Sequence, residues 1–149
     1  MPSKLLVKPS KKSGKVIAVS PASAKWKYVG HDVWKLGPGK TAKGVEAKRE
    51  TCIVFISGKG EVKVDGKSFG VIGERMNVFE GKPWSMFVPM GAKWSVNATT
   101  DCVINICTAP AKKKSEAFVI APDELSIETR GSGSNTRYVC NILPEQDMR

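Results

Sequence analysis

The sequence contains a single histidine, His31, among its 149 residues. Histidine is the commonest metal ligand in proteins and the usual general base near neutral pH. A lone imidazole has no second histidine with which to form a metal centre, and it stands far in the sequence from any paired carboxylates. We therefore expect His31, which alternates with apolar neighbours, to be a surface or interface residue rather than a catalytic one.

The sequence also lacks a Cys-x-x-Cys pair, although it has four cysteines, Cys52, Cys102, Cys107 and Cys140. Four cysteines allow two disulfides or a metal site, and the spacing supports neither. Cys52 and Cys107 stand inside apolar strand patterns. The pattern favours reduced, buried thiols that pack as small apolar groups.

No apolar run is longer than the five residues 52–56, which is far too short to cross a bilayer. The N-terminus has no apolar segment of the kind that opens a signal peptide. We therefore expect no membrane contact and a cytoplasmic location. The sequence has neither internal repeats nor an apolar stripe at helical spacing, so it predicts little helix.

The net charge of +10 is concentrated in the first third of the chain. Residues 1–49 carry twelve Lys or Arg against two acidic residues, whereas the rest of the chain is balanced. A basic arm can bind nucleic acid. Here only Lys11 and Lys12 are adjacent lysines, and no aromatic residues are interleaved as a stacking surface. The pattern favours a solvated lysine-rich face, with nucleic-acid binding as the weaker alternative.

The clearest strand signals lie in residues 50–94. Residues 52–56 are apolar and rich in β-branched and aromatic side chains, and they end at a glycine turn. Residues 61–65 alternate polar and apolar side chains, as in a half-buried strand. Asp65-Gly66 then predicts a type I′ hairpin turn, because both central residues of that turn need a positive φ.

Short alternating segments broken by Gly and Pro predict an all-β barrel with little helix. Besides the strands above, strands or extended segments are expected at residues 5–9, 16–19, 26–36, 68–72, 77–79, 85–88, 94–98 and 102–107. Ser20 and Pro21 predict one capped helical turn. Residues 41–48 are polar and predict an extended loop. Residues 145–149 look like a linker.

Two stretches of this pattern resemble the sequence motifs of cupins, which are small jelly-roll β-barrels. The first motif has a His-x-His pair, a Glu and an apolar strand that ends in a glycine turn, and here Glu50 and the strand to Gly58 match it. The second motif is Pro-x-Gly-x-x-His, matched by Pro89-Met-Gly91. The resemblance implies a cupin-type jelly-roll barrel over residues 1–110.

The metal ligands of the cupin motifs are missing from this barrel. No histidine precedes Glu50 in the first motif, and Trp94 occupies the place of the histidine in the second. Cupin metals take imidazole and carboxylate ligands, and one carboxylate does not replace three imidazoles. The resemblance therefore implies a metal-free cupin.

A C-terminal string, Gly131-x-Gly-x-Asn-Thr-Arg-Tyr-Val-x-Asn-Ile-Leu-Pro144, is more specific still. It resembles the N-terminal half of the 5-deoxy-glucuronate isomerase family of bacterial myo-inositol catabolism, and the resemblance covers nearly the whole chain. Further matching segments are Lys4–Pro9, Trp26–Gly30, Phe79–Gly81 and Val88–Gly91.

This resemblance implies an enzyme of nearly twice this length that contains two cupins. The complete protein would interconvert 5-deoxy-glucuronate and 2-deoxy-5-keto-gluconate, and it is expected to be a homo-oligomer with a small sugar-acid substrate. The family's metal ligands lie in the second cupin, so a divalent metal is expected only there. Residues 111–149 would be an extension and linker toward that cupin.

Four residues are candidates for facing a cavity at the barrel mouth: Glu50, Trp84, Phe87 and Trp94. Glu50 could act as an acid or base, but a salt bridge with Arg49 or a lysine is the favoured role, because it has no carboxylate partner. Trp94 could stack on a sugar, although a buried indole that fills the place of the metal is favoured.

Three residues of the C-terminal string, Arg137, Tyr138 and Asn141, are candidates for a domain or subunit interface. A purely local structural role is the alternative for this set. Three functions stay open at this point. They are the metal-free half of a sugar-acid isomerase, inactive alone; a stand-alone cupin that binds a small anionic sugar; and, more weakly, a nucleic-acid-binding protein.

Overall fold

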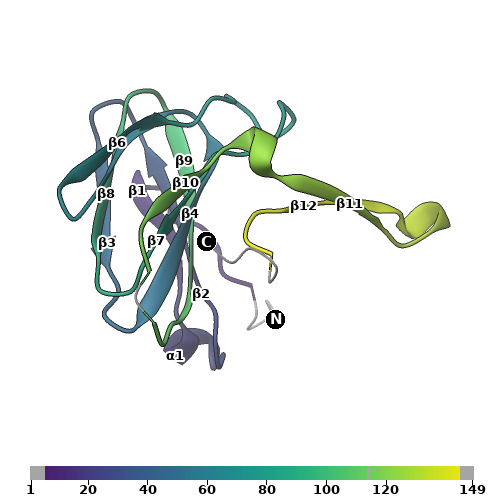
Figure 1. Ribbon diagram of the computed structural model, residues 1–149, viewed down its shortest axis with the longest axis horizontal. Coiled ribbons are helices and arrows are strands. Elements are labelled where there is room, and N and C mark those ends of the chain that lie inside the picture. Colours follow the sequence, from purple (N-terminus) through teal and green to yellow (C-terminus); the bar gives the residue numbers. More distant parts are fainter. Residues whose placement is uncertain (1–5, 114, 145–149) are drawn as a thin grey trace.

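The computed structural model describes residues 6–113 and 115–144, which form two antiparallel sheets and a projecting hairpin (Figure 1). The larger sheet has the order β1 (Gly14–Val19), β2 (Gly30–Leu36), β9 (Cys102–Pro110), β4 (Arg49–Ser57), β7 (Ser85–Val88) and β10 (Phe118–Ile120). The smaller sheet has the order β3 (Thr41–Val45), β8 (Lys93–Ala98), β5 (Gly60–Val64) and β6 (Lys67–Ile72). The hairpin consists of β11 (Ser126–Arg130) and β12 (Arg137–Asn141). The predicted all-β class is confirmed.

Helix in the described residues is limited to three short turns: α1 (Pro21–Ala24) and the 3-10 turns η1 (Pro122–Glu124) and η2 (Gly133–Asn135). The predicted cap of α1 is confirmed, because the Ser23 backbone N–H donates to Ser20 Oγ at 3.0 Å. None of the helices in the described ranges is long and apolar enough to cross a membrane.

The two sheets pack face to face, and their apolar side chains fill the space between them. On β4, Thr51, Ile53 and Phe55 point to this inner face and are at most 2% exposed. Successive strand residues point to opposite faces, so Cys52 and Val54 lie on the outer face of the larger sheet. Every second residue of β4 from Thr51 to Phe55 therefore faces the core.

The predicted hairpin at Asp65-Gly66 is confirmed, with φ angles of 47° and 82°. Asp65 also joins this turn to the neighbouring strand β8, because its Oδ1 accepts a hydrogen bond from the Lys93 backbone N–H at 2.8 Å. The structure also contains the strands predicted at residues 16–19, 68–72, 85–88, 94–98 and 102–107, with ends that differ by at most three residues.

The loop predicted for residues 41–48 is wrong in its first part. Thr41 to Val45 form strand β3, which pairs with β8 at the edge of the smaller sheet. The inward residues of this strand, Ala42 and Gly44, are small. Small side chains give almost no apolar alternation in the sequence, so the strand carried no signal.

Two other strand predictions need correction. The strand expected at residues 26–36 begins only at Gly30, and Trp26 and Tyr28 are about half exposed ahead of it. Residues 77–79 form a turn, because the Glu80 carboxylate accepts hydrogen bonds from the Met76 backbone and the Asn77 side chain. For the strand or extended segment expected at 5–9, residues 6–9 are in no strand and residue 5 lies outside the described residues.

The larger sheet extends beyond the expected barrel boundary at residue 110. β10 pairs with β7 and forms one edge of the six-stranded sheet. After η1 the chain leaves the barrel as the β11–β12 hairpin, which projects from one side of the molecule (Figure 1). The linker predicted at 145–149 lies outside the described residues.

Candidate functional site

The interior of the barrel is apolar where a cupin metal site would be expected. The buried cluster between the sheets comprises Leu36, Ala42, Ile53, Phe55, Val62, Val64, Ile72, Met86, Val88, Ala92, Trp94, Val96, Ala98, Cys102, Ile104 and Ile106. None of these residues carries an imidazole or a carboxylate. The inner faces therefore form a packed core that has no imidazole or carboxylate.

Trp94 is part of this core. It lies on β8, is 6% exposed, and has Gly44 on β3 as its cross-strand partner. A Cβ atom added at Gly44 would stand 2.8 Å from Cζ2 of the indole, so only glycine leaves room for the ring. The burial favours Trp94 as a filler of the interior over Trp94 as a platform for sugar stacking.

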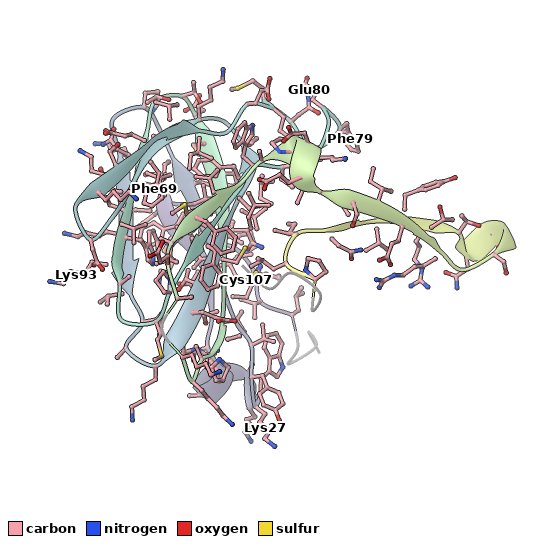
Figure 2. All side chains as sticks on the ribbon, in the orientation of Figure 1. Lys27, Phe69, Phe79, Glu80, Lys93 and Cys107 are labelled. Carbon is pink, nitrogen blue, oxygen red and sulfur yellow. The ribbon has the colours of Figure 1, made fainter. Side chains whose placement is uncertain are left out.

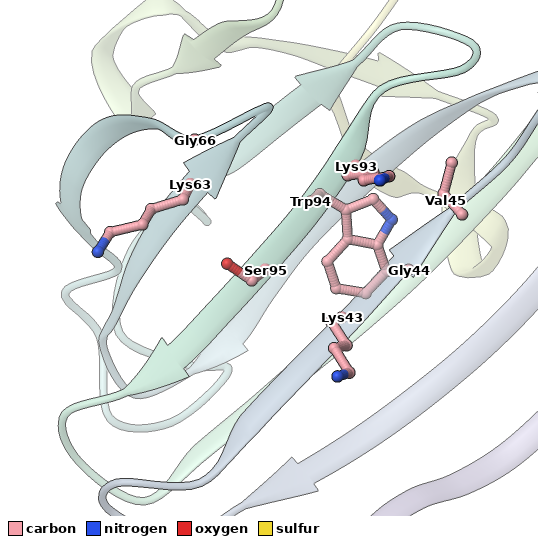
Figure 3. Close-up of a pocket in the computed structure, with 8 residues that line it drawn as sticks. All are labelled: Lys43, Gly44, Val45, Lys63, Gly66, Lys93, Trp94 and Ser95. Carbon is pink, nitrogen blue, oxygen red and sulfur yellow. The ribbon is translucent and has the colours of Figure 1, made fainter.

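A cavity of about 480 Å³ adjoins Trp94 on the smaller sheet, and Figure 3 shows the residues that line it. The lining consists of Lys43, Gly44, Val45, Lys63, Gly66, Lys93, Trp94 and Ser95. The three lysines are exposed side chains of β3, β5 and β8. This hollow can attract an anion, but its lining has no carboxylate or imidazole beside the exposed lysines.

Glu50 and Phe87 lie elsewhere, on the outer face of the larger sheet. They share a different cavity of about 560 Å³ with Lys112 and Leu143. The Phe87 ring stacks on Phe118, with ring centroids 5.0 Å apart. Glu50 and Trp94 therefore face opposite sides of the barrel wall, and the residues expected at one mouth do not meet there.

Trp84 takes a third position. Its ring packs against the edge of the core cluster, and its Nε1 donates to the Glu74 carboxylate at 3.3 Å. Of the four candidate residues, the structure brings together only Glu50 and Phe87. The physical reason is alternation along β7 and β4, which turns Met86 inward and Phe87 outward.

Arg49 is not singled out by the sequence motifs, yet it has the best-defined polar surroundings near the barrel interior. Its Nε donates to Thr108 Oγ1 at 3.1 Å, and its Nη2 donates to the Thr108 carbonyl at 2.9 Å and to the Tyr28 carbonyl. Gly30 makes room for this arrangement, since a Cβ there would stand 2.5 Å from Thr108 Oγ1. The continuous apolar run at residues 52–56 does not show which residues of the strand point inward, so no signal in the sequence singled out Arg49.

The hollow beside Arg49 has a volume of about 440 Å³. Its charged lining residues are Lys15, Asp32, Glu46 and Arg49, with His31 beside them. Lys15 and Asp32 already form an ion pair at 2.6 Å. Arg49 of β4 links Thr108 of β9 to the Tyr28 carbonyl, which lies just before β2, and all of these acceptors are neutral. A structural role accounts for these contacts, because Arg49 connects segments that are distant in the sequence.

Within residues 6–113 and 115–144, no group of three or more His, Cys, Asp or Glu side chains is arranged to hold a metal ion. The residues present therefore do not fit the divalent metal that cupins hold between their sheets. Nor does the apolar interior bring two carboxylates close enough to divide acid and base roles.

The cysteines are free thiols in the structure. Burial, followed by the neighbouring Cys107 and Glu50, raises the pKa of the Cys52 thiol from 9.0 to about 12. Burial likewise raises the pKa of Cys102 to about 11. Both shifts disfavour the thiolate, which is the reactive form.

We expect iodoacetamide to alkylate Cys52 and Cys102 about 10- to 100-fold more slowly at pH 8 in the folded protein than in the denatured chain, because the raised pKa removes most of the thiolate. Peptide mass spectrometry after timed quenching would give each rate. Denaturation in guanidinium is the control. Equal rates in the two states would contradict the burial of these thiols.

The interface candidates Arg137, Tyr138 and Asn141 all lie on β12 of the projecting hairpin. Tyr138 is 78% exposed, whereas Asn141 is half-buried at the base of the hairpin. None of the three lines one of the cavities described above, although Leu143, two residues after Asn141, lines the cavity beside Glu50. The structure thus separates the hairpin set from the cavity set.

Comparison with known proteins agrees with the sequence motifs. Residues 5–149 match the KduI/IolB family. The 5-deoxy-glucuronate isomerase of Geobacillus thermodenitrificans is 39% identical over 133 residues, which is 89% of this chain and 48% of the relative. That of Bacillus subtilis (strain 168) is 35% identical over 121 residues, covering 80% and 45%. The chain spans about half the length of the curated relatives it matches.

Solved structures agree as well. An IolB-like protein from Salmonella typhimurium LT2 superimposes with a TM-score of 0.89 and 37% identity, over 95% of this chain and 54% of that one. A predicted oxalate decarboxylase from Thermotoga maritima superimposes with a TM-score of 0.53 and 17% identity, over 70% and 94%, which shows likeness of fold alone. The cupin-type barrel predicted from the sequence is confirmed, and this chain belongs to the KduI/IolB family.

Proposed function

We propose that this chain is the N-terminal half of a 5-deoxy-glucuronate isomerase and that it serves as the structural, metal-free half of that enzyme. The matched relatives bear that name, and each is about twice as long as the match. The complete protein would interconvert 5-deoxy-glucuronate and 2-deoxy-5-keto-gluconate, in the cytoplasm, as a homo-oligomer.

The observation that carries this proposal is the packed interior of the barrel. Trp94 stands in the position of the histidine of the second cupin motif, and its indole is buried among apolar side chains. An aldose–ketose isomerisation moves a proton between adjacent carbons, so it needs a positioned base and a polarised carbonyl. The inner faces of this barrel supply neither group.

The catalytic chemistry is therefore assigned to the half that this chain does not span. A divalent metal, if the enzyme uses one, would be held there by imidazole and carboxylate ligands. This chain would contribute stability and contacts between halves or subunits. No step of the reaction is assigned to its residues.

A second candidate function is a binding module for a small anionic sugar. Three lysines, Lys43, Lys63 and Lys93, surround the hollow beside Trp94. Exposed lysines attract an anion only weakly in water. A measurable affinity for glucuronate that is lost with Lys43→Ala, but is kept with the distant Lys11→Ala, would favour this alternative.

We expect the purified chain to show no turnover of 5-deoxy-glucuronate, with or without added Mn²⁺, Fe²⁺ or Zn²⁺, because no acid–base or metal-ligand cluster lies in the described barrel. The full-length relative from Geobacillus thermodenitrificans, assayed in the same buffer, is the positive control. Product would be followed by NMR, and bound metal by elemental analysis.

Turnover by the chain alone would show that the active site has been assigned to the wrong half. Stoichiometric metal in a dialysed, tag-free sample would contradict the metal-free assignment separately. The two readouts are independent, so either part of the proposal can fail without the other.

A further inference from the structure

We propose that the projecting hairpin, here called the arm (β11, η2 and β12), docks through one uncharged face onto the second half of the isomerase. The identity of the partner in this inference rests on the proposed function. The position and chemistry of the docking surface on the arm come from the structure. The contact would join the two halves of the enzyme at a defined place.

The register of the arm gives it two chemically different faces. Ile127 pairs with Cys140 and Thr129 pairs with Tyr138, and residues directly opposite in an antiparallel ladder share a face. This face has no charged side chain. It presents an aliphatic, an aromatic, a thiol and a hydroxyl group in one continuous patch.

The opposite face of the arm is charged. Arg130 pairs with Arg137 in the ladder, and the Arg130 guanidinium forms an ion pair with Glu128 at 2.8 Å. Burial of these groups would cost desolvation that an exposed pair does not offset. The charged face is thus suited to water and the uncharged face to a partner.

The uncharged face is open to solvent in this structure. Ile127 is 56% exposed and Tyr138 is 78% exposed. Figure 2 shows the side chains of the arm standing clear of the barrel. Tyrosine is among the residues that most often anchor an interface, because it combines a large apolar ring with a polar tip.

The arm also lacks support of its own. Among the described residues, β11 and β12 pair with each other and with no third strand. An isolated two-stranded hairpin is at best marginally stable in water, and three strands or packing on another element are needed for independent stability. The arm is therefore expected to gain order when its uncharged face is covered.

An exposed aromatic residue lies next to the point where the arm leaves the barrel. Phe79 is 94% exposed in the loop between β6 and β7, and Figure 2 shows it on the side of the barrel from which the arm leaves. Lys82 of the same loop donates to the Leu125 carbonyl at the base of the arm, at 2.6 Å. The surface of the arm thus continues onto this loop.

The loop presents Phe79 in a defined conformation. Arg75 Nε donates to the Ile56 carbonyl at 3.0 Å, and its Nη1 donates to the Gly81 carbonyl at 2.8 Å. Asn77 Oδ1 accepts from the Phe79 backbone N–H at 2.9 Å. A loop whose backbone is already held in place loses less conformational freedom on binding, which suits an interface anchor.

The half-length match identifies the partner. The Salmonella typhimurium structure covers 95% of this chain, and the part left uncovered is shorter than the arm. Part of the arm is therefore retained in a protein of which this chain matches only 54%. In such a protein the remaining half is always present and tethered to this one, at an effective concentration that no separate partner matches.

Hydrogen–deuterium exchange tests the proposal without any variant. The arm peptide of this chain would be compared with the aligned peptide of the full-length Geobacillus thermodenitrificans relative. We expect exchange at least about 100-fold slower in the full-length protein, because the docked arm no longer opens freely. Equal exchange in the two proteins would overturn the proposal.

Protection that rises with protein concentration would place a second copy on the arm and would also overturn the proposal.

A serine substitution gives a second measurement, made both in this chain and in the full-length relative. Tyr138→Ser should leave the urea midpoint of this chain unchanged. In a full-length relative that has an aromatic residue at the aligned position, serine there should accelerate exchange of the arm at least about tenfold, because an interface aromatic is lost.

The matched control is Val71→Ser on β6, an exposed apolar residue of the smaller sheet that is 59% exposed. Its counterpart in the relative should leave arm protection unchanged. An equal effect of the control and of the tyrosine variant would contradict the assigned surface. None of these readouts depends on isomerase turnover, so failure of the proposed function would be seen separately in the activity assay.

Discussion

Replacing Trp94 by histidine should lower the free energy of unfolding by about 2–4 kcal/mol, somewhat below the usual cost of a buried Trp→Ala change. The indole is 6% exposed and fills the space over Gly44. A smaller polar ring would leave a cavity and would place nitrogen atoms among apolar side chains. Urea unfolding of the two proteins measures the difference.

Trp26→His is the matched control, because Trp26 is 50% exposed. Exposed positions usually tolerate substitution within about 0.5 kcal/mol. An unchanged midpoint for Trp94→His would contradict the packing of the indole and would favour the sugar-binding alternative.

The same variant should not create a metal site. A transition-metal site needs at least three protein ligands of suitable type, and the new imidazole would have apolar residues around it. Equilibrium dialysis against Zn²⁺, followed by elemental analysis, checks this. Tight stoichiometric binding would mean that other ligands reach the interior.

The second large effect is expected at Gly58, which follows the last residue of β4. Its φ is +84°, and an added Cβ would stand 2.1 Å from the Asp101 carbonyl oxygen and 2.7 Å from Cys102 Cα. Both neighbours are backbone and cannot swing away. We expect Gly58→Ala to cost roughly 3–5 kcal/mol, which combines left-handed strain with overpacking.

Gly91 provides the control that separates the two causes. Its φ of +81° is nearly the same, but a Cβ added there would have no atom within 4 Å beyond its chain neighbours. Gly91→Ala should therefore show only the conformational strain, about 1–2 kcal/mol. Equal losses for the two variants, measured by urea unfolding, would show that the close approach of β4 and β9 is not what requires glycine at position 58.

Alternation within the strands was predictable because it is local. The period-2 pattern of β5, the Asp65-Gly66 turn and the cap at Ser20 each depend on a few adjacent residues. Strand β3 escaped prediction because its inward residues are too small to give an apolar signal. The extent of the arm was visible only as a glycine-serine turn followed by a strand.

The sequence could not decide which of Arg49, Glu50 and Thr51 faces the barrel interior. A shift of one residue turns every side chain of a strand to the other face. The motif drew attention to Glu50, but the pairing of β4 with β9 turns Thr51 and Arg49 inward. Phe87 and Trp94 are separated for a similar reason. Phe87 lies on the outer face of the larger sheet, whereas Trp94 lies on the inner face of the smaller sheet.

What the sequence by itself determined is which ligand residues are missing from the cupin motifs and the family to which the chain belongs. A single histidine, Trp94 in a ligand position and a specific C-terminal string are facts of composition and order. Only the tertiary structure decided which polar groups meet and which apolar groups stay uncovered. Both depend on strand register and on long-range packing, which bring Arg49 to Thr108 and leave Tyr138 in solvent.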